Sequence, residues 1–180
     1  MENEQFSALL KESICRQFLA SLDALESAIT NCPQEFWTEC IWSDQELPSD
    51  FPSFWAISHH TLFWADLYLT GAVEGYTTPV PFGLDELDPA GLLPPRIYEK
   101  SELLEFLEYI KKKCSRVIIQ SNFNDLTRIC SFSWGSLPYA ELCIDNIRHI
   151  QEHAAQLNLY LGQKKQIRSS WFCRGIVDPD

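Results

Sequence analysis

Two histidines lie four positions apart in the stretch RHIQEHAAQLNLYL, residues 148 to 161, whose apolar spacing is that of a helix. Side chains four residues apart project from the same side of a helix, one turn from each other. The imidazoles of His149 and His153 can therefore reach one metal ion, as histidine pairs do in other helix-borne sites. A pair of boundary residues, hydrogen-bonded to water or to carboxylates, gives the same spacing, so the pair by itself leaves both interpretations open.

The row of this helix that carries the histidines lies between its apolar side and its charged side. It also contains Asn146 and Gln156, and it is about 100° around the helix from the apolar stripe. The stripe, which repeats by four and three residues and should pack into the core, consists of Cys143, Ile147, Ile150, Ala154, Leu157 and Leu161. The sequence therefore predicts a set of polar groups directly beside the core.

The other two histidines of the chain are adjacent, in the segment FWAISHHTLFWADLYL. His60 shares its row with apolar residues, which predicts that it points inward, whereas the row through His59 is more mixed. An imidazole among aromatic side chains needs a partner for its ring nitrogens. A backbone carbonyl or the Asp66 carboxylate would serve, and so would a metal ion. All four histidines fall in these two clusters, which favours a metal site more than the pair alone does.

Helical periodicity recurs often enough to predict the fold class. Apolar residues follow it in four segments, at about residues 5–30, 54–70, 99–117 and 137–161. Four amphipathic helices predict an all-α protein, a four-helix bundle, and such bundles build metal sites from side chains on facing helices. The long connections at 33–53 and 71–98 contain aromatic residues and leucines, so we expect them to be packed down. The second permits a crossover, and residues 123–134 are expected to form a short extended piece.

The composition argues against several classes of protein. The net charge of −11 gives no attraction to a phosphate backbone, so we expect no nucleic-acid partner. No apolar stretch reaches the roughly 20 residues that cross a bilayer, and the polar N-terminus does not resemble a secretory signal. Seven cysteines without a CxxC pair indicate reduced, mostly buried thiols in a cytoplasmic protein. The 180 residues suit a single domain, residues 1–180.

These histidine motifs resemble those of the DinB-like family of metal-binding four-helix-bundle proteins, the DinB/YfiT type. The resemblance rests on FWAISHHTLFWADLYL, on RHIQEHAAQLN and on the closing WFCR, and it covers most of the chain from about residue 51 onward. It implies a bundle with a long crossover connection between helices 2 and 3. It also implies a divalent metal held by three histidines, which correspond to His60, His149 and His153 of this sequence.

The choice between the two adjacent histidines also comes from the resemblance. His60 directly precedes TLFW, where the family places its ligand, and His59 is the alternative. Relatives often carry a histidine just before the last ligand, whereas this chain has Glu152 there. Because Glu152 falls on the charged outer row of its helix, we do not expect the difference to remove the metal.

The wider family includes metal-dependent thiol transferases and a thiol-dependent isomerase that use bacillithiol or mycothiol. The resemblance therefore implies a divalent-metal-dependent protein with a small-molecule partner, a low-molecular-weight thiol, and it implies a homodimer. Zinc, nickel and iron all suit imidazole ligands, with zinc or nickel favoured. A metal-ligating histidine usually donates its other ring N–H to a nearby acceptor, and Asn146, Gln156 and Asp66 are candidates for that acceptor. Two alternatives stay open: a non-catalytic metal-binding or stress-related bundle protein, and a purely structural role for the histidines.

Overall fold

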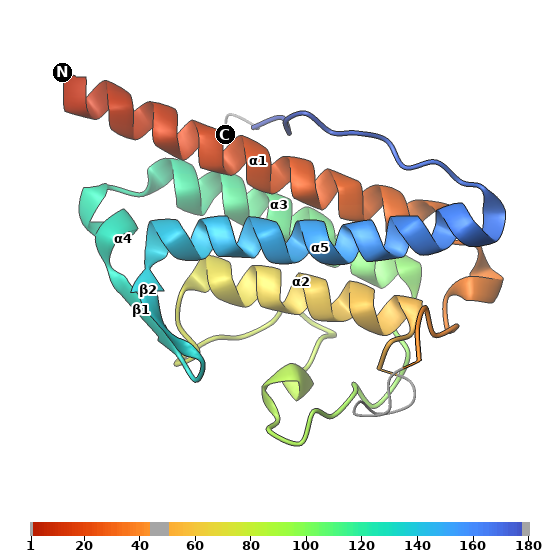
Figure 1. The fold of residues 1–180 in the computed structure, drawn as a ribbon. Helices are drawn as coiled ribbons and strands as arrows, with labels where there is room; N and C mark the ends of the chain where they lie inside the picture. The colour runs from red at the N-terminus through yellow and green to blue at the C-terminus, as the bar shows by residue number, and fades with distance from the viewer. Residues whose placement is uncertain (1, 44–50, 178–180) are drawn as a thin grey trace.

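Most of the chain is helical, as expected of an all-α protein. The computed structural model describes residues 2–43 and 51–177. The four long helices are α1 (Glu2–Asn31), α2 (Phe54–Thr70), α3 (Lys100–Gln120) and α5 (Tyr139–Lys165). They run side by side, α1 packing against α3 and α5, and α2 likewise packing against α3 and α5 (Figure 1).

The direction of the helices explains why one connection is long. Helices α2 and α3 run in the same direction, opposite to α1 and α5 (Figure 1). Two parallel neighbours need a connection that returns along the full length of the first helix, which is about 25 Å for a helix of this size. The segment between α2 and α3 does this and includes the short 3₁₀ helix η2 (Asp85–Leu87).

This connection is packed down, as the sequence predicts. Phe82 and Tyr98 are buried in the main core, and Phe82 stacks on Phe106 of α3 with ring centroids 4.4 Å apart. The connection between α1 and α2 contains the 3₁₀ helix η1 (Gln34–Phe36) and the buried Trp37, whose indole N–H donates to the Tyr98 carbonyl at 2.8 Å. Residues 44–50 of that connection lie outside the described residues. Both connections are thus held to the core by aromatic residues, whereas Leu84 and Leu92 of the second connection are exposed, contrary to the expectation for its leucines.

Helix α2 differs from the other long helices because it is buried on nearly all sides. A helix that is apolar all round belongs in the interior of a protein, and every residue of α2 is buried except His60, Trp64, Tyr68 and Thr70. The first three are spaced by four residues, so they form one strip along the helix. One line of side chains is therefore all that α2 presents toward the outside.

The last helix differs from its predicted range at both ends. It begins at Tyr139 because residues 135–138 form strand β2 (Gly135–Pro138). It continues past Gly162 to Lys165, and the left-handed position that ends it is Gln166, at φ 57°, whose N–H donates to the Gly162 carbonyl. The end of α2 is as predicted: Gly71 takes φ 76° there, and its N–H donates to the Leu67 carbonyl.

Residues 123–134 are extended only in their second half. The first half forms the short helix α4 (Phe123–Thr127), because the Asn122 side chain accepts hydrogen bonds from two backbone N–H groups of its first turn. Strand β1 (Ile129–Phe132) follows and pairs with β2 as an antiparallel hairpin. The hairpin lies at the C-terminal end of α2 (Figure 1).

The segment after α5 runs back along α1 (Figure 1). Gly175 donates its N–H to the Arg16 carbonyl at 2.8 Å, and Gln17 donates to the Cys173 carbonyl at 3.1 Å. A Cβ at Gly175 would lie 2.2 Å from the Leu19 side chain, so this close approach requires glycine. The seven cysteines are all free thiols; five are buried and two, at 40 and 173, are exposed.

Candidate metal centre

The three histidines of the predicted set lie together where α2 faces α5. One ring nitrogen from each of His60, His149 and His153 lies within 4.8 Å of the others, and Nε2 of His60 is 3.4 Å from Nε2 of His149. The ring centroids are 4.7 to 5.4 Å apart in the three pairs. Each ring is partly exposed, so the cluster lies at the edge of the core rather than inside it.

Hydrogen bonds fix the orientation of two of the rings. The Nδ1–H of His60 donates to the Glu86 carboxylate at 2.8 Å, and the Nδ1–H of His153 donates to Oε1 of Gln156 at 2.8 Å. A ring nitrogen that donates leaves the other with a free lone pair in a neutral imidazole. Nε2 of both rings is therefore the atom available to bind a cation.

The outer nitrogen of the third ring has no such partner. Nδ1 of His149 is buried and has no hydrogen-bond partner among the described residues. Oδ1 of Asn146, one helical turn earlier, is buried and without a partner as well, while its Nδ2 donates to the Ala65 carbonyl at 3.0 Å. Nε2 of His149 is left facing His60, so this ring also presents a nitrogen to the centre of the cluster.

The surroundings keep the cluster in the protonation state that metal binding needs. Burial, with the neighbouring His153 and His60, lowers the pKa of His149 to about 3. Burial and His60 likewise lower the pKa of His153. Burial alone would raise the pKa of Glu86, but the contacts with His59 and His60 outweigh it and lower that pKa to about 2. At neutral pH His149 and His153 are therefore neutral imidazoles, and the Glu86 carboxylate behind His60 is ionised.

These three donors could hold a divalent ion: their ligand atoms lie within 4.8 Å of one another, and one of the three separations equals that of a tetrahedral zinc site. Nitrogens at the zinc–nitrogen distance of about 2.0–2.1 Å in a tetrahedral site are about 3.4 Å apart, which matches the 3.4 Å between Nε2 of His60 and Nε2 of His149. Three imidazoles leave at least one coordination position to a small molecule. Glu152, which stands where relatives often carry a histidine, is exposed. The side chains that could hold an ion here are the three histidines, and Glu152 is not one of them.

The adjacent histidine of α2 has a different environment. His59 is 1 % exposed, and its ring packs against Tyr98 and Phe82 with centroids 4.9 and 5.9 Å away. Its Nδ1 is 3.7 Å from Glu86 Oε1, which is too long for a hydrogen bond, so we describe this contact as electrostatic. His59 therefore points into the aromatic core, contrary to the expectation that His60 is the inward residue. His60 is partly exposed and is the α2 histidine that faces α5.

Only one of the three predicted outer partners contacts a histidine of the cluster. Gln156 does, whereas Asp66 is fully buried in an ion pair with Lys113 and accepts the Tyr76 hydroxyl at 2.9 Å. The main partner, Glu86, was not predicted. It comes from the α2–α3 connection, where the segment LDELD offers three acidic residues and no periodicity by which to choose among them.

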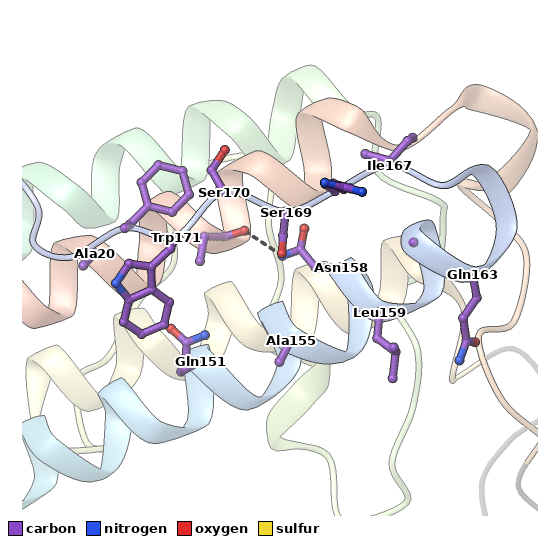
Figure 2. A pocket seen from close by; sticks show the side chains of 14 residues that line it. Ala20, Gln151, Ala155, Asn158, Leu159, Gln163, Ile167, Ser169, Ser170 and Trp171 are labelled. Atoms are coloured by element: carbon purple, nitrogen blue, oxygen red, sulfur yellow. Dashed lines mark hydrogen bonds between the residues drawn. The ribbon is translucent and has the colours of Figure 1, made fainter.

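A separate cavity of about 690 Å³ lies on the other side of α5. Figure 2 shows it between α5, α1 and the C-terminal segment, with Ala20, Gln151, Ala155 and Trp171 around it. Gln151 and Ala155 each follow a histidine of the cluster by two residues, which places them about 200° around the helix. The cavity and the histidine cluster therefore have no shared opening on α5.

Comparison of the chain with protein-family models, with curated proteins and with solved structures found no match. In the described part of the chain, no helix has the length and apolar character needed to cross a bilayer.

Proposed function

We propose that this chain is a divalent-metal-dependent protein of the DinB-like kind that transfers a low-molecular-weight thiol. The observation that carries the proposal is the convergence of three imidazoles, His60 from α2 with His149 and His153 from α5, on one point. Two of these rings have their outer N–H groups hydrogen-bonded to Glu86 and Gln156, which is the arrangement that metal-ligating histidines usually have.

The fold supports the same proposal. In the DinB-like bundle a long crossover separates the second and third helices. Here α2 and α3 are parallel neighbours joined by a long, packed segment (Figure 1). The segment also delivers Glu86 to the histidine cluster, so the crossover is part of the proposed site as well as of the topology.

Each residue has a defined part in the proposed chemistry. A divalent ion held by the three imidazoles would act as a Lewis acid that lowers the pKa of a thiol beside it, so that a thiolate nucleophile forms near neutral pH. Glu86 holds the His60 ring and makes it a stronger donor, because a carboxylate that accepts from Nδ1–H increases the basicity of Nε2. Gln156 orients His153 in the same way without adding charge.

Metal content is the first test. Protein purified without chelator and dialysed against zinc or nickel should contain one ion per chain, whereas His153→Ala should contain much less than one. Wild-type protein that stays metal-free after this treatment would contradict the proposal, because all three donors are already in place.

Thiol transfer is the second test. The metal-loaded protein should accelerate the reaction of bacillithiol or mycothiol with chlorodinitrobenzene, and His153→Ala treated with the same metal should not. Glutathione alone is not a sufficient probe, because the family uses other thiols. Stoichiometric metal without acceleration by either thiol would favour the alternative of a non-catalytic metal-binding protein.

A further inference from the structure

A strip of aromatic side chains begins at the histidine cluster. The outward-facing positions of α2 are His60, Trp64 and Tyr68, with Thr70 at its end. Positions spaced by four residues repeat about every 6 Å along a helix, so the three side chains extend over about 12 Å. The strip is continuous with the proposed metal centre because His60 belongs to both.

The hairpin lengthens the strip beyond α2. The ring centroids of His60 and Trp64 are 6.3 Å apart, and those of Trp64 and Tyr68 are 5.4 Å apart. Tyr68 then contacts Phe132 at 5.1 Å and Trp134 at 6.0 Å, and these two rings are stacked on each other. Trp134 is 51 % exposed. Trp64, Tyr68 and Phe132 are partly buried, so each presents an edge or part of a face to solvent. Aromatic residues that reach the surface singly are normal, whereas a contiguous row of them favours a binding surface.

The polar atoms of the strip already have partners. Trp64 donates its indole N–H to Glu86 at 3.1 Å, and Trp134 donates its own to the Tyr68 hydroxyl at 3.1 Å. The acidic group that faces Tyr68, Asp145, is paired with Arg148 at 3.3 Å. The strip therefore offers ring surfaces rather than hydrogen bonds or an unpaired charge, which suits a flat, uncharged group.

We propose that this strip binds the flat aromatic or conjugated part of a substrate whose reacting end lies at the three histidines. The inference rests on the proposed function, because the strip leads away from a residue that we assign as a metal ligand. Rings of the ligand would stack on Trp64 and Tyr68 in the offset or edge-to-face geometry that aromatic pairs prefer. Trp64 and Tyr68 are specificity-determining residues in this proposal, and they take no part in the chemistry.

Two chelators with the same metal-binding end test the proposal. Acetohydroxamic acid reaches the metal alone, and naphthohydroxamic acid carries a two-ring system that also reaches Trp64 and Tyr68. Calorimetric titration of the zinc-loaded protein should give a dissociation constant at least about tenfold lower for the naphthyl compound. Metal content is measured on the same samples, so metal loading and ring binding are separate readouts.

Variants of the strip separate its contribution from that of the metal. Tyr68→Leu should weaken naphthohydroxamic acid several-fold while leaving metal content and the affinity for acetohydroxamic acid unchanged. Trp64→Leu should weaken the naphthyl compound several-fold more than it weakens acetohydroxamic acid, a ratio that corrects for the loss of its hydrogen bond to Glu86. Trp134→Leu is the matched control, since it lies beyond the reach of a two-ring probe and should change the naphthyl affinity less than about twofold.

The outcomes distinguish this inference from the proposed function. Zinc-loaded protein that binds both chelators equally, or strip variants that bind the naphthyl compound as wild type does, would overturn the inference alone. Protein that takes up no metal would overturn the proposed function, and the inference with it.

Discussion

The two sides of helix α5 differ in what they could bind: one side carries possible metal ligands, and the other borders a cavity. The side that faces α2 carries His149 and His153, whose ring nitrogens meet that of His60 within 4.8 Å. The opposite side borders a cavity of about 690 Å³ that is lined in part by small residues, among them Ala155 and Gly162. The side that faces α2 has three converging ring nitrogens, and hydrogen bonds orient two of the three rings. The opposite side has an open cavity, and none of its described lining residues belongs to a group that could hold a metal ion.

This difference shows that a cavity and a chemical site need not coincide. A cation site needs donor atoms at defined separations and outer hydrogen bonds that hold them there. It does not need a large empty space, because a metal ion and one small ligand are compact.

Removing one donor should abolish stoichiometric metal binding. His149→Ala takes away the ring whose Nε2 is 3.4 Å from that of His60. The loss of affinity should exceed the roughly 10- to 100-fold loss that mutation of an outer partner causes. Elemental analysis after dialysis against zinc measures it, and Gln151→Ala, on the other side of the same helix, is the control that should stay loaded. If His149→Ala and Gln151→Ala contained equal amounts of zinc, the metal site would not lie on the side of α5 that faces α2.

Removing the buried carboxylate of α2 should reduce stability and leave the metal in place. Asp66→Ala leaves the Lys113 ammonium, whose side chain is 11 % exposed, without its partner. Breaking such a pair costs about 3–5 kcal/mol in the free energy of unfolding, or about 10 °C in Tm. Urea unfolding followed by circular dichroism measures it.

Asp145→Ala is the control for that measurement, because the Asp145–Arg148 pair is exposed and should change stability by less than about 1 kcal/mol. If folded Asp66→Ala protein failed to bind zinc, Asp66 would be part of the metal site. That result would contradict the present assignment, in which its carboxylate serves Lys113 and Tyr76.

Removing the outer carboxylate should weaken metal binding without abolishing it. Glu86→Ala removes the acceptor of the His60 Nδ1–H and of the Trp64 indole N–H. The zinc affinity should fall by about 10- to 100-fold, as for other outer partners of ligating histidines. Competition with a coloured chelator measures it. Glu74→Ala is the control, since Glu74 lies exposed in the same connection and its removal should have no effect.

Filling the cavity on the other side should have the smallest effect. Ala155→Leu adds apolar volume to an exposed position that lines the cavity of Figure 2. Its effect on stability should lie within about 0.5 kcal/mol, and zinc content and thiol transfer should equal those of the wild type. A clear loss of activity in this variant would place a substrate in the cavity and would contradict our assignment of the two sides.

The histidine cluster was accessible from the sequence only in part. The spacing of His149 and His153 follows from helical periodicity, so their common side could be read directly. Periodicity also favoured His60 over His59 as the inward residue, and that prediction was wrong: His59 is 1 % exposed in the aromatic core, whereas His60 lies on the partly exposed strip of α2. The choice of His60 as the ligand came from the resemblance. Glu86 could not be found, because a residue of an aperiodic connection has no row that predicts its direction.

What the sequence by itself determined is the set of local properties: four long helices, the apolar stripe of each, the stop at Gly71 and the pairing of two histidines one turn apart. These depend on interactions within a few residues, which repeat with the period of the helix. The tertiary structure alone decided which side of α2 faces α5 and that the crossover brings Glu86 against His60, 26 residues earlier in the chain. Such contacts depend on the packing of whole elements, and no short stretch of sequence specifies that packing.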